Sequence, residues 1–183
     1  MQIRTILLII FASTSCVWLF TDTRAFKERL MRVTKPAGIV AAFFQLIVIA
    51  FQILQPTILP FPTPFYHPVV SVIGLIVYVL GALFAAWGRL SMGKSWGVPA
   101  QHEIDKQKNL VTTGPFKYSR NPIYVGLLVM FIGFELALRS WLILLAIPLY
   151  YFIKRAIQTE EKLLEHHFEK EYMNYKKEVR WFL

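Results

Sequence analysis

Polar residues that can recognise a charged ligand gather in one segment of this sequence. The segment Leu110–Tyr124 has the sequence LVTTGPFKYSRNPIY. Its Gly114–Pro115 pair predicts a turn, and Pro122 fits the first turn of a helix, with Asn121 as the N-cap. Free N–H groups at a helix start, with the Arg120 guanidinium beside them, favour a carboxylate ligand. An arginine that contacts lipid phosphate at a membrane surface is the alternative, and it stays open at this point.

A second polar set lies on a helix that we predict from about Tyr150 to Val179. Its apolar face is marked by residues at spacings of three, four and seven: Ile157, Leu164, Phe168, Tyr172, Tyr175 and Val179. Glu161 fills the seven-residue gap on this face, and Glu160 faces an adjacent sector. A buried carboxylate costs free energy unless it is paired. The alternative is that both acids lie near the surface and pair with neighbouring Lys and Arg side chains.

The composition indicates a membrane protein. Of 183 residues, 56% are hydrophobic, and they form long blocks separated by short basic segments. The net charge of +9 by itself also fits a nucleic-acid-binding protein. Because the basic residues flank apolar blocks, we attribute this charge to membrane topology and predict no nucleic-acid partner.

The apolar blocks predict the fold. Three spans are expected at 5–20, 36–54 and 69–87, and two shorter pieces at 123–138 and 141–153, joined by a turn near Arg139 and Ser140. The predicted class is an all-α integral membrane protein with about five transmembrane helices. The last two form a short helical hairpin, and a cytoplasmic C-terminal amphipathic helix follows. We divide the chain into N-terminal transmembrane helices, 1–92, and one unit of loop, hairpin and C-terminal helix, 93–183.

The loops predict the orientation. Segments rich in Lys and Arg alternate with segments that have almost none, as five crossings with an external N-terminus require. The 89–120 segment and the C-terminal tail then both face the cytoplasm, where a soluble cofactor would bind. The plasma or inner membrane of a prokaryote is the expected location.

Three motifs taken together resemble the isoprenylcysteine carboxyl methyltransferase family, which includes phospholipid methyltransferase-like proteins. They are the 110–126 segment, the Glu160–Glu161 pair and the stretch Phe168–Tyr175. The family pattern is Arg-His-Pro-x-Tyr, then a Glu-Glu pair about one hairpin later, then Glu-Tyr-x-x-Tyr. The resemblance covers roughly residues 93–180. This chain departs from the pattern at Asn121 and Lys108, where the family often has histidine.

The resemblance implies a cytoplasm-facing pocket for S-adenosyl-L-methionine. No metal site is expected from the residues themselves, because His166 and His167 are adjacent and have no third ligand at useful spacing. The expected cofactor-binding residues are Leu110, Val111, Gly114, Tyr118, Arg120, Asn121, Pro122, Tyr124, Glu160 and Glu161. The expected catalytic residues are Arg120, Glu160 and Glu161. Arg120 would hold an anionic group of cofactor or substrate, and one of the acids would receive the cofactor's amino group or the motif arginine.

The predicted function is methyl transfer to a lipophilic acceptor, of the isoprenylcysteine-carboxylate kind, that enters from the bilayer. A carboxylate acceptor needs no general base, which suits a site with Arg and Glu but no evident catalytic His or Cys. Alternatives are methyl transfer to a phospholipid amine or small thiol, a nicotinamide-dependent membrane reductase, and a non-enzymatic membrane subunit. Membrane lipids are expected partners, and the sequence leaves the oligomeric state open.

Overall fold

The computed structural model describes residues 68–95 and 109–182, together with Ile47, Ala50, Phe51, Leu54, Gln55, Ile58 and Leu59. Most of these described residues are helical, the others lie in turns, bends or irregular segments, and none of them is in a β-strand. The predicted span 5–20 lies outside the described residues, as does most of 36–54. The part of the prediction that bears on the candidate site lies within them.

The longest elements are three α-helices. Helix α4 is Pro68–Met92 and continues into a 3₁₀ turn, Gly93–Ser95. A second 3₁₀ turn, Gly114–Lys117, precedes α5, Pro122–Leu138, and a third, Trp141–Leu145, precedes α6, Ala146–Glu178. The chain divides into two compact units, Met1–Leu75 with Phe134–Ile143, and Ile76–Gly133 with Leu144–Leu183.

In the first unit, the chain reverses at Arg139 and Ser140, where the sequence predicted the hairpin turn. Arg139 adopts a positive φ of 55°. The Ser140 N–H donates to the Glu135 carbonyl at 2.8 Å, and the Arg139 N–H donates to the Leu136 carbonyl at 3.0 Å. These bonds satisfy carbonyl groups at the end of α5 that would otherwise lack a partner.

The surface of α4 carries the signature of a lipid-facing helix. Helix α4 and the stretch Trp141–Glu178 are both long and apolar enough to cross a membrane. Large apolar side chains of α4 lie exposed: Val69, Val72, Ile73, Ile76, Leu80, Leu83, Trp87 and Leu90. In water such a continuous apolar surface would be costly, whereas in hydrocarbon it is the expected outer face.

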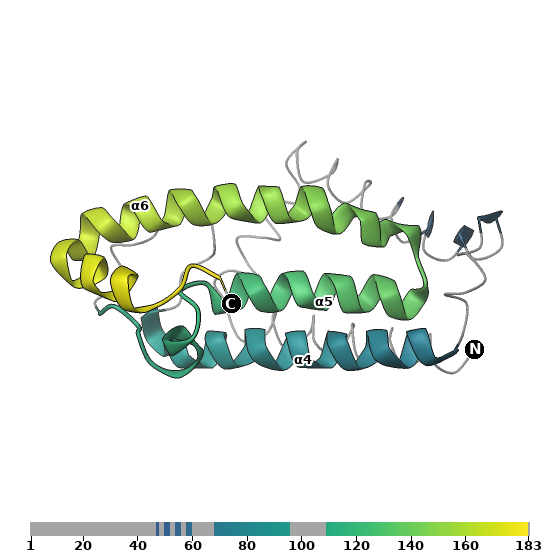
Figure 1. Cartoon of the computed structure of the whole chain (residues 1–183), viewed down its shortest axis with the longest axis horizontal. Helices are drawn as coiled ribbons and strands as arrows, with labels where there is room; N and C mark the ends of the chain where they lie inside the picture. The colour runs from purple at the N-terminus through teal and green to yellow at the C-terminus, as the bar shows by residue number, and fades with distance from the viewer. Residues whose placement is uncertain are drawn as a thin grey trace. The chain divides into compact units, whose positions relative to one another are not determined.

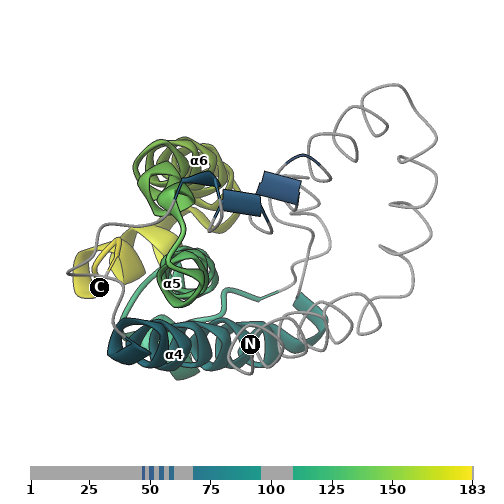
Figure 2. The same cartoon turned by 90° about the vertical axis from the view of Figure 1, so that its right-hand side faces the viewer.

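In the second unit, small residues bring α4 and α5 into backbone contact. A Cβ on Gly81 would lie 2.6 Å from the Met130 nitrogen and 2.9 Å from the Gly126 carbonyl oxygen. A Cβ on Gly126 would lie 2.6 Å from the Ala85 Cβ. The two helices run antiparallel and side by side (Figures 1 and 2). Small residues at a helix interface permit this approach, which favours association in a membrane through van der Waals contact.

The opposite side of α5 packs on α6 through larger side chains. Leu128 of α5 and Ile153 and Ile157 of α6 form a buried cluster. Partly buried apolar residues surround it: Tyr124, Ile132, Leu149, Tyr150, Trp181 and Phe182. Two of these, Trp181 and Phe182, follow the end of α6, so the chain returns to its own core after that helix.

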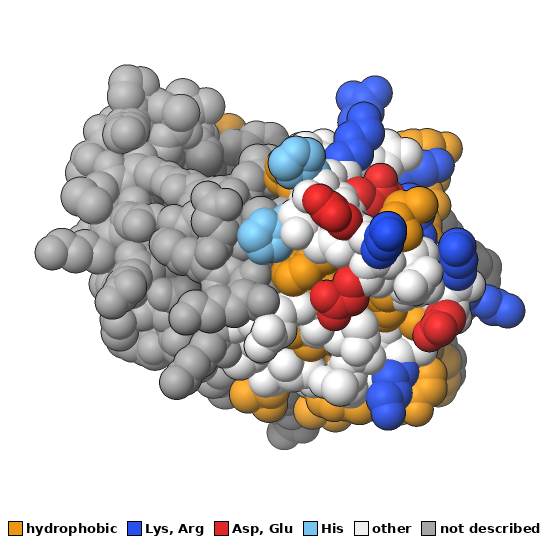
Figure 3. All heavy atoms as spheres, turned by 90° about the vertical axis from the view of Figure 1, so that its left-hand side faces the viewer, with side chains coloured by type: hydrophobic (Ala, Val, Ile, Leu, Met, Phe, Trp, Pro, Cys, Tyr) orange, Lys and Arg blue, Asp and Glu red, His pale blue; other side chains and the backbone are white. Residues whose placement is uncertain are grey.

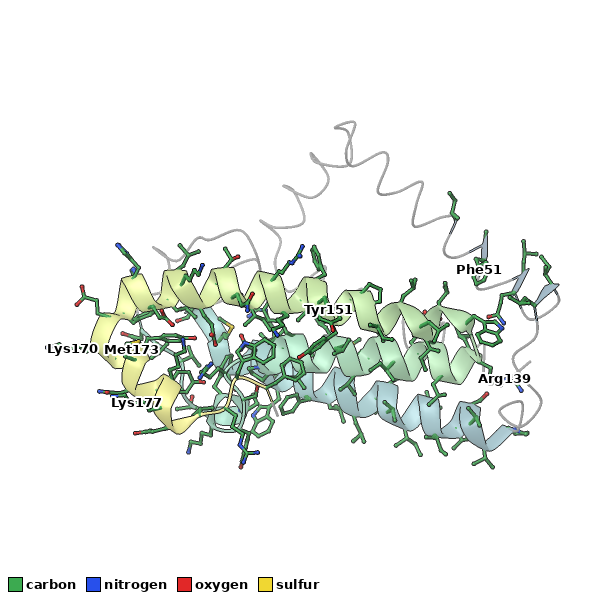
Figure 4. The ribbon with its side chains drawn as sticks, turned by 45° about the horizontal axis from the view of Figure 1, so that its top comes forward. Phe51, Arg139, Tyr151, Lys170, Met173 and Lys177 are labelled. Carbon is green, nitrogen blue, oxygen red and sulfur yellow. The ribbon has the colours of Figure 1, made fainter. Side chains whose placement is uncertain are left out.

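A sharp bend in α6 makes this return possible. Glu169 has φ 42° and ψ −115°, outside the helical region, and residues 170–178 resume the helix in another direction (Figure 1). We call residues 170–178 the returning segment and residues 179–182 the strap. Lys170, Met173 and Lys177 are labelled on the returning segment in Figure 4. The sequence predicted one uninterrupted tail helix from about Tyr150. The structure instead begins α6 at Ala146 and bends it at Glu169.

The close contact of α4 with α5 predicts that Gly81→Val destabilises the protein. The new side chain meets backbone atoms of α5 that cannot rotate away, and overpacking of this kind costs about 1–3 kcal/mol. Thermal unfolding in detergent should show a lower midpoint for this variant. Leu83→Val is the control, because Leu83 is 63% exposed on the same helix. Equal midpoints for the two variants would contradict the contact.

Candidate functional site

The segment before α5 is folded by the turn that the sequence predicted. Gly114 has φ 63°, a left-handed conformation that favours glycine, and starts the Gly114–Lys117 turn. Helix α5 then begins at Pro122. Asn121 occupies the N-cap position, because its carbonyl accepts the Val125 N–H at 3.1 Å. Its side-chain Nδ2 donates to the Trp181 carbonyl at 2.9 Å, which ties the helix start to the strap.

Arg120 and Glu161 form a buried ion pair. The Arg120 Nε lies 2.9 Å from the Glu161 Oε1, and the two side chains are 8% and 10% exposed. The Arg120 Nη1 also donates to the carbonyls of Lys176, at 3.0 Å, and Val179, at 3.1 Å. One guanidinium therefore holds α6 and its returning segment together. The sequence analysis expected Arg120 to lie close to one acid of the Glu160–Glu161 pair. It did not predict the hydrogen bonds from Arg120 to the Lys176 and Val179 carbonyls.

The backbone of Arg120 holds the strap as well. Its N–H donates to the Arg180 carbonyl at 3.0 Å. On the returning segment, the Tyr175 hydroxyl donates to the Phe116 carbonyl at 2.7 Å, which fixes the segment to the 3₁₀ turn. The Lys176 ammonium pairs with Glu165 and lies 4.0 Å from Glu161. The returning segment is thus bonded along its length to the loop before α5 and to the main part of α6.

Glu160 faces a different environment from its neighbour. Its Oε2 accepts a hydrogen bond from the Tyr124 hydroxyl at 2.9 Å. The side chain is half-buried and borders a cavity, whereas Glu161 does not line that cavity. Adjacent acids therefore have separate surroundings: Glu161 pairs with Arg120, and Glu160 bonds to Tyr124 at the edge of the cavity.

This cavity is bounded by the end of α4, the loop before α5, the start of α5, α6 and the returning segment. Its empty volume is about 620 Å³, part of it open to solvent. The lining combines polar and apolar side chains: Met92, Leu110, Val111, Phe116, Arg120, Asn121, Pro122, Ile123, Tyr124, Glu160, Leu164, Tyr172 and Tyr175.

Tyr172 adds a buried hydroxyl to the cavity wall. Tyr172 is 1% exposed and lies on the polar returning segment, beyond the apolar part of α6. Burial raises the pKa of its hydroxyl, and the nearby Glu161 carboxylate raises this pKa further. The group therefore remains protonated at neutral pH, so it serves as a hydrogen-bond donor rather than a base.

Most of the predicted cofactor-binding residues come together at this cavity, and three do not line it. Those on the lining are Leu110, Val111, Arg120, Asn121, Pro122, Tyr124 and Glu160. Gly114 lies in the turn, and Glu161 is paired to Arg120. Tyr118 is 61% exposed, and its ring centroid lies 6.3 Å from that of Trp87. The structure thus does not place Tyr118 at the cavity, because the 3₁₀ turn directs it outward.

The sequence did not single out the remaining lining residues as ligand contacts: Met92, Phe116, Ile123, Leu164, Tyr172 and Tyr175. A signal existed for three of them, since Leu164, Tyr172 and Tyr175 are on the predicted apolar face. An apolar helix face indicates packing in the core. Because the helix bends at Glu169, the last part of this face lines the cavity instead. In the part of the chain that the structure describes, no group of three or more His, Cys, Asp and Glu side chains is placed to hold a metal ion.

Charged side chains crowd the end of this unit where α6 bends. Figure 3 shows Lys, Arg, Glu and His side chains gathered on this face. The exposed residues there include Lys162, His166, His167, Glu169, Lys170, Glu171 and Lys177. Such a surface requires water or lipid headgroups, so the cavity lies at a polar end of the helices rather than along their apolar flanks.

The buried ion pair predicts that Glu161→Gln loosens the returning segment. The variant leaves the Arg120 charge buried without its partner, and breaking such a pair costs about 3–5 kcal/mol. We expect a lower unfolding midpoint and faster trypsin cleavage after Lys177 and Arg180. Glu171→Gln is the matched control, because it makes the same change at an exposed site on the returning segment. Identical cleavage rates in both variants would rule out this anchoring role.

Known proteins with related sequences are methyltransferases. Residues 69–171 match the profile of the phospholipid methyltransferase family. Protein-S-isoprenylcysteine O-methyltransferases of Xenopus laevis and Homo sapiens are 34% and 31% identical over 111 residues, which is 60% of this chain and 38% and 39% of theirs. The chain therefore spans well under half the length of these curated relatives.

A solved structure shares the fold. The eukaryotic intramembrane Ras methyltransferase, an isoprenylcysteine carboxyl methyltransferase, superposes with a TM-score of 0.64 and is 26% identical. The match covers 80% of this chain and 51% of that one. The profile match extends over more than half of the chain and includes α4, α5 and most of α6. The chain is an α-helical membrane protein that belongs to the phospholipid methyltransferase family.

Proposed function

We propose that this protein transfers a methyl group from S-adenosyl-L-methionine to the carboxylate of a lipophilic, isoprenylcysteine-like acceptor. The observation that carries this proposal is the cavity of about 620 Å³, in which the Glu160 carboxylate faces an otherwise largely apolar lining. The curated relatives act on protein-S-isoprenylcysteine by their names. Together, a polar cavity at the end of apolar helices and this family membership favour a reaction between a soluble donor and a membrane-borne acceptor.

The lining fits the chemical groups of S-adenosyl-L-methionine. Leu110, Val111 and Phe116 offer an apolar wall for a purine ring. The Glu160 carboxylate suits an ammonium group, through a charge-assisted hydrogen bond. The start of α5, with the N–H groups of Ile123 and Tyr124 in its first turn, suits a carboxylate.

When bound, S-adenosyl-L-methionine supplies an electrophilic methyl group on a sulfonium, which makes a strong nucleophile unnecessary. The task of the chain is then to align the acceptor and exclude water. Tyr124 and Tyr172 border the cavity as aromatic walls, and the returning segment closes one side of it. Arg120, with at least three of its donors engaged, holds that side in place and so positions the cavity wall.

A carboxylate acceptor is ionised at neutral pH and needs no base. A phospholipid amine must lose a proton before it accepts the methyl group. Methylation of an amine is the second candidate, and the family profile carries the phospholipid name. The two differ in pH dependence, since turnover of an amine should rise more steeply with pH.

The proposal includes an arrangement in the membrane. About five crossings would place the N-terminus outside and the cavity, which is lined by Met92 and by residues between Leu110 and Tyr175, on the cytoplasmic side. The charged end of the second unit supports this placement, because it lies where a soluble cofactor has access (Figure 3). The short hairpin of α5 and the start of α6 would lie in the membrane, and the returning segment would lie at its surface.

The proposal predicts that Glu160→Gln weakens binding of S-adenosyl-L-methionine while the fold is kept. A hydrogen bond to a charged group contributes about 1.5–3 kcal/mol, so the dissociation constant should rise by roughly ten- to a hundredfold. Isothermal titration of the purified protein in detergent measures this constant. Methyl transfer from isotope-labelled cofactor to prenylated cysteine, phospholipid and small-thiol acceptors measures the reaction.

Glu171→Gln is again the control, since it removes the same charge from an exposed position. The wild type and the control should bind the cofactor equally, and the unfolding midpoint of Glu160→Gln should stay close to both. Failure of the wild-type protein to bind S-adenosyl-L-methionine would contradict the proposed function. Equal affinities for all three proteins would remove Glu160 from the site.

A further inference from the structure

Helix α5 forms two helix–helix interfaces along which an apolar chain could approach the cavity, one with α4 and one with α6. We call them the α4–α5 seam and the α5–α6 seam. This inference rests on the proposed function, because a lipophilic acceptor places its reactive group in the cavity while its tail stays in apolar surroundings. Pro122, Ile123 and Tyr124 at the start of α5 line the cavity. Among the helices that the structure describes, these two seams are the routes by which a tail could leave the cavity along α5.

The seam between α4 and α5 is closed by backbone. Besides the contacts at Gly81 and Gly126, a Cβ on Gly88 would lie 2.8 Å from the Cγ1 of Ile123. The helices are in close contact at Gly81, Gly88 and Gly126, where a larger side chain in place of the glycine would clash. No apolar chain can enter here without separating two helices that pack through their main chains.

The seam between α5 and α6 is covered by side chains of the strap. Trp181 and Phe182 pack on the cluster of Leu128, Ile153 and Ile157, and both are only partly buried. Their ring centroids lie 6.5 and 6.1 Å from that of Tyr150, both in edge-to-face geometry. The cover is thus a set of aromatic rings that can change rotamer, in contrast to the backbone contact on the other side of α5.

This cover adjoins the cavity and is anchored at its rim. Tyr124, which lines the cavity, packs on the same cluster as Trp181 and Phe182. The strap is held by its main chain, through Arg120 to the Val179 and Arg180 carbonyls and through Asn121 to the Trp181 carbonyl. These bonds fix the backbone of the strap and do not involve the Trp181 and Phe182 side chains.

We propose that Trp181 and Phe182 determine which acceptor tails the protein accepts, by forming the movable wall of a tail-binding groove along the α5–α6 seam. The occupant is the prenyl chain of the acceptor, an apolar chain that follows the seam from Tyr124 toward Leu128 and Ile132. The aromatic rings fill this space when no tail is present, and their size limits the length of tail that fits. Lys154, whose ammonium lies 5.9 Å from the Trp181 ring centroid, helps to orient that ring.

Affinity for prenyl chains of different length tests the groove. The probes are N-acetylcysteines with a geranyl, farnesyl or geranylgeranyl thioether, and the measurement is equilibrium binding to the full chain in lipid nanodiscs. Trp181→Ala and Phe182→Ala should each shift the preference toward the geranylgeranyl chain, by roughly tenfold relative to geranyl. Trp181→Phe should shift it less, since it keeps a ring. Trp87→Ala is the control, because Trp87 lies exposed on α4.

The outcomes separate this inference from the proposed function. An unchanged length preference in Trp181→Ala and Phe182→Ala, whether or not cofactor binding falls, would show that the rings only stabilise the fold, and the inference would fail. Absence of binding of all three thioethers to the wild type would overturn it too. Length-dependent binding without methyl transfer would support the groove and reject the reaction.

Discussion

The site depends on one buried interaction, the pair of Arg120 with Glu161. Removing both charges from water is expensive, and the attraction between them offsets this cost only when their other hydrogen-bonding groups are also satisfied. Here the Lys176 and Val179 carbonyls accept from the same guanidinium. These carbonyls belong to the last turn of α6 and the residue after it, where the helix itself supplies no donors. The pair is therefore compatible with one placement of the returning segment, the one that walls the cavity.

The two sides of α5 make different kinds of contact, close to the main chain toward α4 and through side chains toward α6. This difference suits a membrane enzyme. In lipid, apolar side chains gain little by meeting each other, so a fixed contact needs close approach of main chains. Gly81, Ala85 and Gly126 provide it toward α4. Toward α6, the contact is made by side chains instead, among them the aromatic residues Tyr124, Tyr150 and Trp181. A rigid platform on one side permits adjustment on the other without loss of the fold.

The sequence predicted those features that depend on local chemistry. The turn at Gly114, the start of α5 at Pro122 and the reversal at Arg139 each follow from residues within the turn itself. The bend at Glu169 has no such signal, because a glutamate at φ 42° is held there by distant contacts and not by its own preference. The strap was missed for the same reason: its partners, Arg120 and Asn121, are about 60 positions away.

The division of roles between Glu160 and Glu161 also lay beyond the sequence. Successive residues of a helix project roughly 100° apart, so a pair of adjacent acids cannot share one partner on one face. One acid had to turn toward Arg120, and the periodicity of the apolar face favoured Glu161. The other was then left at the edge of that face, where the cavity opens beside Tyr124. An acidic pair at such a boundary places one carboxylate against Arg120, where it holds the cavity wall, and the other beside Tyr124 on the cavity lining, so the two carboxylates are not interchangeable.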